Sequence, residues 1–492
     1  MTINKKIGLI VVLIAALFVF SSVSSFIATS STANPVSASS SQNALSTQPV
    51  PAQQSLEASL SSMGVSLPSQ TTSIGTLSGF SYSGPVSSGT QVTATLVIPL
   101  RNIAELESMS EEISSPGSPL YHHFLTSAQE KSMFYPTVQY DCLMTQLNEL
   151  GLKIISTSSD SIITVQGSSS QISSIFGLTE NMYSNGTAYY YAGSGPTSFD
   201  GAILISSNVS AILHATPTTL ITEPLKSPDG LGARSKTAQA PVFGLSYYLP
   251  TALEAVYGAT SMYAEGYNGT NQNIGILDYL GDPCIAQQLN YYDSLVKIPN
   301  PPSFTIQPIG PYDPELGVAQ GWCGEISLDV ESSHSMAPGA NQTLYIANGN
   351  CFLITAIGFI DQQDKVNSLS QSFSIPESET ASFSPQLTLL CSVLPNLYYE
   401  LGSDEGITFS ASSGDAGGSG YSNGAIGSIG LPAASPYVTA LGGTTTYIDF
   451  QNACIVCPVV GFNQTAWTNY GFVPNFVNYG GSSGFGIFTR ES

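Results

Sequence analysis

Hydrophobic residues recur with two different periods between residues 76 and 224. Every second residue is apolar from Val92 to Ile98, which predicts a strand with one buried face. Apolar residues then recur at helical spacing from Ile103 to Ile113 and from Leu143 to Leu150, where Gly151 follows in the position of a helix cap. This mixture of strand and helix patterns predicts a small α/β domain with its own core.

From residue 242 onward, apolar strand patterns alternate with helical ones. Alternation of this kind predicts a parallel sheet with helices on both faces. The expected strands are Ile274 to Tyr279, Thr343 to Ala347, Ile407 to Ser410 and Tyr437 to Leu441, and the expected helices are Trp322 to Met336 and Phe352 to Ile360.

The first 75 residues carry no globular pattern. Two lysines precede an uncharged apolar run from Ile7 to Phe20, which predicts an export signal over residues 1–28. If the run continues to Ala28, it is also long enough for a membrane anchor. Residues 29–75 consist mainly of Ser, Thr, Ala, Gln and Pro, so a flexible spacer is expected there.

A third segment without periodicity, residues 225–241, separates the two globular regions. Gly, Pro and the basic residues Lys226, Arg234 and Lys236 cluster in it, which is typical of an exposed linker with a cleavage site. The predicted order is therefore 1–28 signal or anchor, 29–75 spacer, 76–224 small domain, 225–241 linker and 242–492 larger domain.

Composition narrows the function classes. Charged residues make up only 9 % of the chain, and 33 acidic residues against 11 basic ones give a net charge of -22. This charge balance argues against a nucleic-acid partner, because binding nucleic acid needs a basic protein surface that displaces counterions. The balance fits a protein that works in acid, where carboxylates are partly neutralised. A Ser- and Thr-rich extracellular protein without acid adaptation is the alternative.

Six of the seven cysteines lie in the C-terminal half of the chain. In an exported protein these six allow three disulfides in any of 15 pairings. Cys454 and Cys457 form a Cys-x-x-Cys motif, but no histidine or second such motif lies nearby. Disulfides are therefore favoured over a zinc site.

Few residues of the larger domain suit acid-base catalysis. His334 is its only histidine, and the chain contains no His-Glu-x-x-His motif and no cluster of ligands at zinc spacing. Catalysis would therefore fall to carboxylates. Glu325 and Asp329 are four residues apart, so on a helix they share one face, and apolar neighbours would favour a shared proton. The alternative is an ordinary solvated acidic face.

A second candidate is Asp415, in the Gly-rich turn from Phe409 to Gly420. Such a turn lets the backbone approach a ligand closely, and a protonated Asp there could donate a hydrogen bond to a developing oxyanion. The alternative is an Asp that stabilises a tight turn.

Together, several motifs resemble the sedolisin family of serine-carboxyl peptidases, which includes the kumamolisin-like enzymes. Gly324 to Ala340 resembles the family's helix, with its Glu-x-x-x-Asp pair ahead of Ala-Pro-Gly-Ala, and Ser413 to Gly417 resembles its Ser-Gly-Asp-x-Gly turn. Leu431 to Thr444 and Tyr248 to Gly258 are similar to the strand after that turn and to the start of the mature enzyme. Ser115 to Thr126 resembles part of the family's activation propeptide.

The resemblance implies a fold and a role for each matching residue. The larger domain would be subtilisin-like, with the propeptide as a smaller α/β domain before it. Glu325 would be the general base and acid, Asp329 would orient it and hold the shared proton, and Asp415 would serve the oxyanion hole. Asp278 matches the position where relatives can have a supporting Glu. Residues Ser372, Phe373 and Ser374 would pair with the substrate backbone, although Phe373 replaces a Trp of some relatives.

One motif of the family is absent. The nucleophile of the family lies in Gly-Thr-Ser-x-x-x-Pro, and this sequence contains no such segment. Ser482 and Ser483 resemble a segment upstream of it, so neither is assigned as nucleophile. The resemblance therefore implies a catalytic domain that is incomplete at its C-terminus. The calcium expected in complete members of the family would have no site residues here, and no other metal is expected.

The sequence thus predicts an exported, acid-acting endopeptidase zymogen, extracellular or at the cell surface, with proteins or peptides as substrates. Its own propeptide would inhibit it by covering the cleft until acid releases it. Three alternatives stay open. A downstream segment supplies the serine, the chain is a non-catalytic remnant that acts as a surface or binding protein, or Glu325 and Asp329 hydrolyse peptides with water alone.

Overall fold

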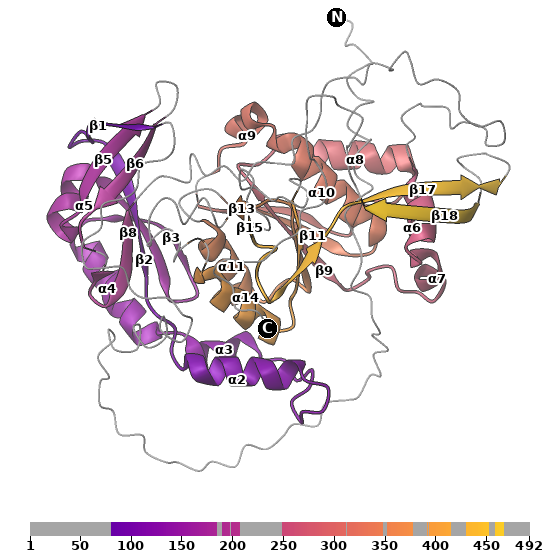
Figure 1. Cartoon of the computed structure of the whole chain (residues 1–492), viewed down its shortest axis with the longest axis horizontal. Coiled ribbons are helices and arrows are strands. Elements are labelled where there is room, and N and C mark those ends of the chain that lie inside the picture. The colour runs from indigo at the N-terminus through magenta and orange to yellow at the C-terminus, as the bar shows by residue number, and fades with distance from the viewer. Residues whose placement is uncertain are drawn as a thin grey trace, which may run out of the picture.

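The computed structural model describes residues 80–184, 189–196, 198–206, 248–310, 312–347, 352–376, 391, 393–414, 430–451 and 458–466. The predicted signal or anchor, the spacer, the linker and Asp415 lie outside these residues. Within them, no helix is both long enough and apolar enough to cross a membrane. The described residues form an N-terminal domain of antiparallel sheets and helices and a C-terminal domain around a parallel sheet (Figure 1).

The N-terminal domain contains two antiparallel sheets. One has the order β3-β4-β2-β8-β7 and the other β1-β5-β6. The strands are β1 (Ser81–Pro85), β2 (Gln91–Val97), β3 (Lys153–Ser158), β4 (Ile162–Ser168), β5 (Thr179–Ser184), β6 (Tyr189–Ser194), β7 (Ser198–Phe199) and β8 (Ala202–Ser206), and the helices are α2 (Ile103–Ser114), α3 (Ser127–Phe134), α4 (Thr137–Glu149) and α5 (Ser169–Phe176).

Local sequence explains where several of these elements begin and end. The alternating strand is confirmed as β2, with Ala94 and Leu96 fully buried. Helix α4 is followed by Gly151 in the left-handed conformation, as its position predicts. Helix α5 begins with a capping box between Ser168 and Gln171, which satisfies two backbone donors of the first turn.

The C-terminal domain contains a six-stranded sheet in the order β10-β11-β9-β12-β14-β16, and every neighbouring pair in it is parallel. Its strands are β9 (Asn273–Tyr279), β10 (Phe304–Ile309), β11 (Asn341–Ala347), β12 (Ser368–Gln371), β14 (Thr408–Ser412) and β16 (Val438–Leu441). All four strands predicted for this domain are therefore confirmed, and β10 and β12 are added. The strand β12 reads Ser-Leu-Ser-Gln, too short and too polar to predict from its pattern.

Helices flank this sheet, which confirms the expected α/β class with a parallel sheet. Two of them pack against each other over β9 and β11: α8 (Ile285–Val296) and α10 (Trp322–Met336). A second packed pair consists of α11 (Phe352–Gln363) and α14 (Pro395–Asp404). Smaller elements complete the domain: α6 (Pro250–Val256), α7 (Ala259–Ala264), α9 (Pro314–Gln320), the pair β13 (Ile375–Pro376) and β15 (Gly430–Leu431), and the hairpin of β17 (Thr444–Phe450) and β18 (Val459–Ala466).

The two domains meet through α11 and α14. Helices α2 and α3 and strand β3 of the N-terminal domain pack against this pair (Figure 1). Apolar residues of both domains join one continuous core cluster, including Ile162 and Phe134 on one side and Ile357 and Tyr398 on the other. Burial of this shared apolar surface stabilises the docked arrangement.

Candidate active site

Three acidic side chains gather where the central strands of the parallel sheet end. Asp278 lies near the carboxyl end of β9, and Glu325 and Asp329 lie on α10, which packs on that strand. The neighbouring strand β12 ends at Gln371, which pairs with Leu277, so Ser372 and Asp278 follow on adjacent strands. Ligands of open α/β sheets bind at this edge. We call Asp278, Glu325 and Asp329 the active-site carboxyl cluster.

Glu325 and Asp329 are buried on one face of α10. Glu325 is fully buried and Asp329 is 6 % exposed. The apolar residues between and beside them, Ile326, Leu328 and Val330, are buried as well. The pair therefore does not form a solvated acidic face, which was the alternative interpretation of this spacing.

A serine hydroxyl contacts the first of these carboxylates. Ser372 Oγ donates a hydrogen bond to Glu325 Oε1 at 2.5 Å, and the side chains of both residues are buried. A hydroxyl in hydrogen-bond contact with a carboxylate is the arrangement in which a base orients or activates an oxygen nucleophile. The sequence suggested only a substrate-binding role for Ser372, since nothing local indicates that it reaches a residue 47 positions earlier.

The environment of the cluster favours protonated carboxyl groups. Burial, followed by the charges of Asp278 and Glu325, raises the pKa of Asp329 well above its usual range. Burial raises the pKa of Asp278 to about 7, and neither of its oxygens has a hydrogen-bond partner among the described residues. Because like charges cannot all be held together away from water, the three groups keep at least one proton among them in acid.

Three aromatic rings form one wall beside the cluster. The Tyr279 ring lies 4.9 Å from that of Trp322 and 5.4 Å, edge to face, from that of Phe373. All three are buried. Phe373 was a candidate from the sequence, but Trp322 was not. Its position three residues before Glu325, on the same helical face, was the signal that could have identified it.

Of the two remaining candidate residues, Ser374 lies among the described residues and Asp415 does not. Ser374 is buried two residues beyond Ser372, and the preceding Gln371 accepts a hydrogen bond of 2.6 Å from Tyr399 Oη, which fixes the start of this segment. Asp415 lies outside the described residues. In the sequence it comes three residues after β14 ends, and β14 is the strand beside β12.

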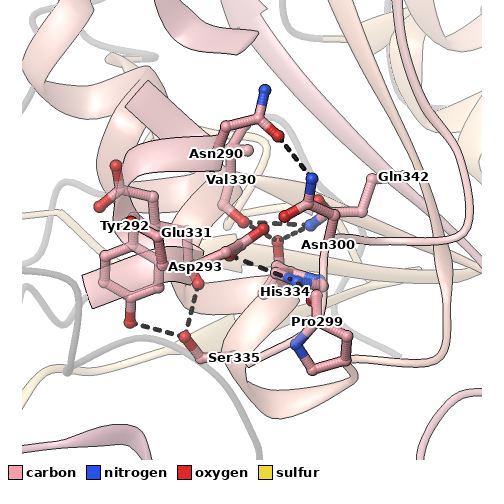
Figure 2. Close-up of polar contacts among 12 residues, drawn as sticks. Asn290, Tyr292, Asp293, Pro299, Asn300, Val330, Glu331, His334, Ser335 and Gln342 are labelled. Carbon is pink, nitrogen blue, oxygen red and sulfur yellow. Dashed lines mark hydrogen bonds and ion pairs between the residues drawn. The ribbon is translucent and has the colours of Figure 1, made fainter. Parts of the chain in front are cut away.

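The only histidine of the C-terminal domain does not reach the cluster. His334 lies nine residues after Glu325 on α10, about 14 Å further along the helix axis. Its Nε2 lies 2.8 Å from the Pro299 carbonyl oxygen and 3.4 Å from an oxygen of Asp293 (Figure 2). Burial lowers the pKa of His334, and because a carbonyl oxygen can only accept, Nε2 is the donor to Pro299.

The surroundings of His334 are a closed polar network. Burial raises the pKa of Asp293 to about 7, and burial with the charge of Asp293 raises that of Glu331 to about 8. Ser335 Oγ donates to the Glu331 carbonyl oxygen at 2.8 Å and lies 2.6 Å from Tyr292 Oη (Figure 2). These bonds tie α10 to α8, so the network is structural.

The described residues include three of the six C-terminal cysteines, Cys284, Cys323 and Cys391, together with parts of their surroundings. Cys391 is disulfide-bonded, whereas Cys284 and Cys323 are free thiols. The pairing of all six C-terminal cysteines that the sequence allowed is therefore not found. Burial, followed by the charge of Asp282, raises the pKa of Cys323 to about 12, so this thiol stays protonated, and therefore a poor nucleophile, in acid and at neutral pH.

Within the described part of the chain, only one group of three acidic side chains has oxygens within 4.8 Å of one another, and none of the active-site carboxylates belongs to it. It consists of Glu130, Asp361 and Glu405, from elements that meet where the two domains pack together. The calcium expected from the resemblance remains a prediction.

Comparison with known proteins finds one matching family model and several similar peptidases. Residues 78–212 match the family described as Pro-kumamolisin, activation domain. Over 414 residues the chain is 25 % identical to Sedolisin from Pseudomonas sp. (strain 101), covering 81 % of this chain and 66 % of that protein. It is 30 % identical over 216 residues to Kumamolisin from Bacillus sp. (strain MN-32), covering 43 % of this chain and 36 % of the relative.

A third relative shows similar coverage. The chain is 25 % identical over 391 residues to Xanthomonalisin from Xanthomonas sp. (strain T-22), covering 71 % of this chain and 45 % of that protein. The chain thus spans slightly under two thirds of the length of the first relative and less than half of the other two.

Proposed function

Because this chain belongs to the sedolisin family and carries its activation domain, we propose that it is the exported zymogen of an acid-acting serine-carboxyl endopeptidase. The observation that carries the proposal is the buried pair of Glu325 and Asp329 on α10, with a serine hydroxyl 2.5 Å from Glu325. Its substrates are proteins or peptides, and its place is outside the cell or at the cell surface.

Each residue of the site has a role in the proposed reaction. Glu325 removes the proton of the attacking hydroxyl and later returns it to the leaving amine. Asp329, with Asp278 behind it, keeps a proton and orients Glu325. Asp415 is protonated and donates to the oxyanion of the tetrahedral intermediate. The segment Ser372 to Ser374 pairs with the substrate backbone by strand addition, and Phe373 packs on the aromatic wall.

No serine of these 492 residues is assigned as the nucleophile of the family. The sequence contains no Gly-Thr-Ser-x-x-x-Pro segment, and the chain covers only part of each relative. In the proposed reaction, attack of a serine on the peptide carbonyl expels the amine and forms an acyl-enzyme, which water then hydrolyses with Glu325 acting as base.

Acid action is supported by the state of the buried carboxyl groups. Burial raises the pKa of Asp278, Asp293 and Glu180 to about 7 and that of Glu331 to about 8. Each of these groups stabilises the folded protein most when it is protonated. Such a protein is best suited to a medium in which carboxyl groups carry their protons.

A second candidate function follows from the contact between Ser372 and Glu325. In it, Ser372 is itself the nucleophile and the chain needs no further serine. The distance of 2.5 Å suits activation by Glu325. The burial of Ser372, which is 5 % exposed, argues against access by a peptide carbonyl, so positioning of Glu325 is the favoured role.

The test is cleavage of a denatured protein at pH 4 by the purified 492-residue chain and by Glu325→Gln, with folding verified by circular dichroism. Glu315→Gln, an exposed acid on α9, is the matched control. The proposal expects no cleavage by the chain alone and cleavage by the full gene product, which Glu325→Gln abolishes and Glu315→Gln leaves unchanged.

Covalent labelling with a serine-directed reagent, mapped by mass spectrometry, separates the candidates. A label on a serine beyond residue 492 of the gene product supports the proposed reaction, and a label on Ser372 supports the second candidate. Activity without any labelled serine would contradict both and favour hydrolysis by carboxylates and water.

A further inference from the structure

A second group of buried carboxyl groups spans the contact between the two domains. Glu130 lies on α3 of the activation domain, whereas Asp361 on α11 and Glu405, directly after α14, belong to the C-terminal domain. Oxygens of the three side chains lie within 4.8 Å of one another. Glu130 and Asp361 are fully buried, and Glu405 is 9 % exposed. We call these three residues the interface carboxyl cluster.

Among the described residues, no basic group forms an ion pair with this cluster. Lys131, the only basic residue of α3, instead forms an ion pair of 2.7 Å with Asp160 within the activation domain. Within the same part of the chain, none of the six carboxyl oxygens has a hydrogen-bond partner of ordinary geometry. The hydroxyls of Tyr135 and Ser127 are near enough to lower the pKa of Glu130 and Glu405 respectively, but Ser127 Oγ donates to Asp364 at 3.0 Å instead.

The other ionisable groups around the cluster are mostly acidic. Asp364 follows α11 and Asp404 ends α14, and the charges of both raise the pKa of Asp361. Asp404 accepts a hydrogen bond of 2.7 Å from Ser110 on α2, so it too lies at the interface. Tyr398 on α14 and Tyr135 after α3 face the cluster as neutral phenols, because burial raises the pKa of each. The two nearby lysines are engaged elsewhere, Lys131 with Asp160 and Lys365 with Gln363, so burial and other acids are what raise these carboxyl pKa values.

Carboxyl oxygens that face each other can form a hydrogen bond only when one of them carries a proton. Burial raises the pKa of Glu130 to about 9 and, with the nearby Glu130, that of Glu405 to about 10. Burial and the charge of Glu405 raise the pKa of Asp361 well above its usual range. Separation of the domains would return Glu130 to water and remove it from the other two carboxyl groups, which would lower these values.

We propose that Glu130, Asp361 and Glu405 form a proton-dependent contact that holds the activation domain on the catalytic domain in acid and loosens it as the three carboxyl groups ionise towards neutral pH. The docked state binds more protons than the separated state. The contact is therefore strongest below the usual carboxyl pKa of 4.5 and weakens as the pH rises from there towards 9. This is the reverse of the release by acid that the sequence suggested.

The inference goes beyond the proposed peptidase activity and does not depend on it. In acid, cleavage of the linker would leave the activation domain docked on α11 and α14. Removal of the domain would then need its proteolytic destruction or a move to higher pH, so acid alone would not dissociate it.

Hydrogen exchange of the intact 492-residue chain tests this contact without any assay of activity. Amide protection in α3 and α11, corrected for the intrinsic effect of pH on exchange, is measured at pH 5 and pH 8, and intact mass excludes cleavage. We expect protection in α3 to fall at least about tenfold at pH 8, which equals one pKa unit of linkage. Equal protection at both values, or lower protection at pH 5, would overturn the proposal.

Variants locate the effect. Glu130→Gln keeps the shape of the protonated acid and should reduce the fall in protection, whereas Glu112→Gln, an exposed acid on α2, should behave as the parent chain. Glu405→Gln is the second variant if Glu130→Gln does not fold. A full pH effect in a folded Glu130→Gln chain would contradict the assignment.

Addition of calcium or of a chelator distinguishes a contact that depends on protons from one that depends on a bound metal ion. At pH 8, calcium chloride or EDTA should leave the exchange of α3 and α11 unchanged. If calcium restored protection at pH 8 and EDTA removed it, a bound cation rather than protons would join the carboxyl groups, and the proposal would fail.

Discussion

The active-site and interface carboxyl clusters resemble each other in burial and differ in what surrounds them. Asp278, Glu325 and Asp329 come from one strand and one helix of the same domain, next to the hydroxyl of Ser372. The interface cluster draws Glu130 from one domain and its other two members from another. Burial raises the pKa in both. The first cluster lies within one domain beside the hydroxyl of Ser372, so its protonation does not depend on how the two domains dock.

In the interface carboxyl cluster, the raised carboxyl pKa values affect the docking of the two domains. Its geometry exists only while α3 is docked on α11 and α14, so its protons are linked to the docking of the domains. A raised carboxyl pKa therefore indicates a function only together with the elements that hold the group. The network of Asp293, Glu331 and His334 makes the same point, since its raised carboxyl pKa values occur where His334 contacts Asp293 and the Pro299 carbonyl oxygen, away from the active-site cluster.

The largest expected effect tests the active-site cluster. Asp329→Asn in the full gene product should lower kcat/KM at pH 4 by about 100-fold or more, because Asn cannot exchange a proton with Glu325. The melting temperature at pH 4 should stay within a few degrees, since Asn replaces an acid that is already neutral. Steady-state kinetics and thermal unfolding give both values. Unchanged kinetics would remove Asp329 from the mechanism.

Ser372→Ala tests what the Ser372 hydroxyl, which donates to Glu325, does in the reaction. If Ser372 positions Glu325, kcat/KM should fall by about tenfold, and its pH profile should shift because Glu325 loses a donor. Ser370→Ala, on the preceding strand β12, is the matched control. A complete loss of activity together with a loss of covalent labelling would identify Ser372 as the nucleophile.

Asp278→Asn tests the linkage within one domain. The pKa of Asp278 is raised from its usual 3.8 to about 7, so its contribution to stability is complete below pH 3.8 and is lost as the pH rises through 7. The variant should match the parent chain at pH 4 and melt several degrees higher at pH 8. Asp141→Asn, exposed on α4, should change neither value. A variant that melts lower than the parent at pH 8 would contradict the assigned cause.

The smallest expected effect is that of Tyr398→Phe, which removes an uncharged hydrogen bond between the two domains. The hydroxyls of Ser161 and Tyr398 hydrogen-bond across the two domains. Tyr398→Phe should weaken docking by about 1 kcal/mol at every pH, because no charge is involved. Hydrogen exchange of α3 at pH 5 and pH 8 should show equal losses of protection. Unequal losses would mean that this hydroxyl takes part in the proton linkage.

The sequence by itself determined the elements whose signal is local. The helix from Trp322 to Met336, the alternation in β2 and the apolar strands of the parallel sheet follow from hydrophobic period, which reflects one buried face. The spacing of Glu325 and Asp329 placed them on one helical face for the same reason. Several short motifs follow one another in this sequence in the same order as in the sedolisin family, and this order indicated the resemblance.

Only the tertiary structure decided which distant residues meet. Ser372 reaches Glu325 because β12, whose pattern is too polar to predict, inserts beside β9 in the sheet. Glu130 meets Asp361 across 231 positions because two domains dock. Periodicity carries no information about the pairing of strands or the docking of surfaces. Those depend on the free energy of the whole packed core, and the pKa values of buried groups follow from it.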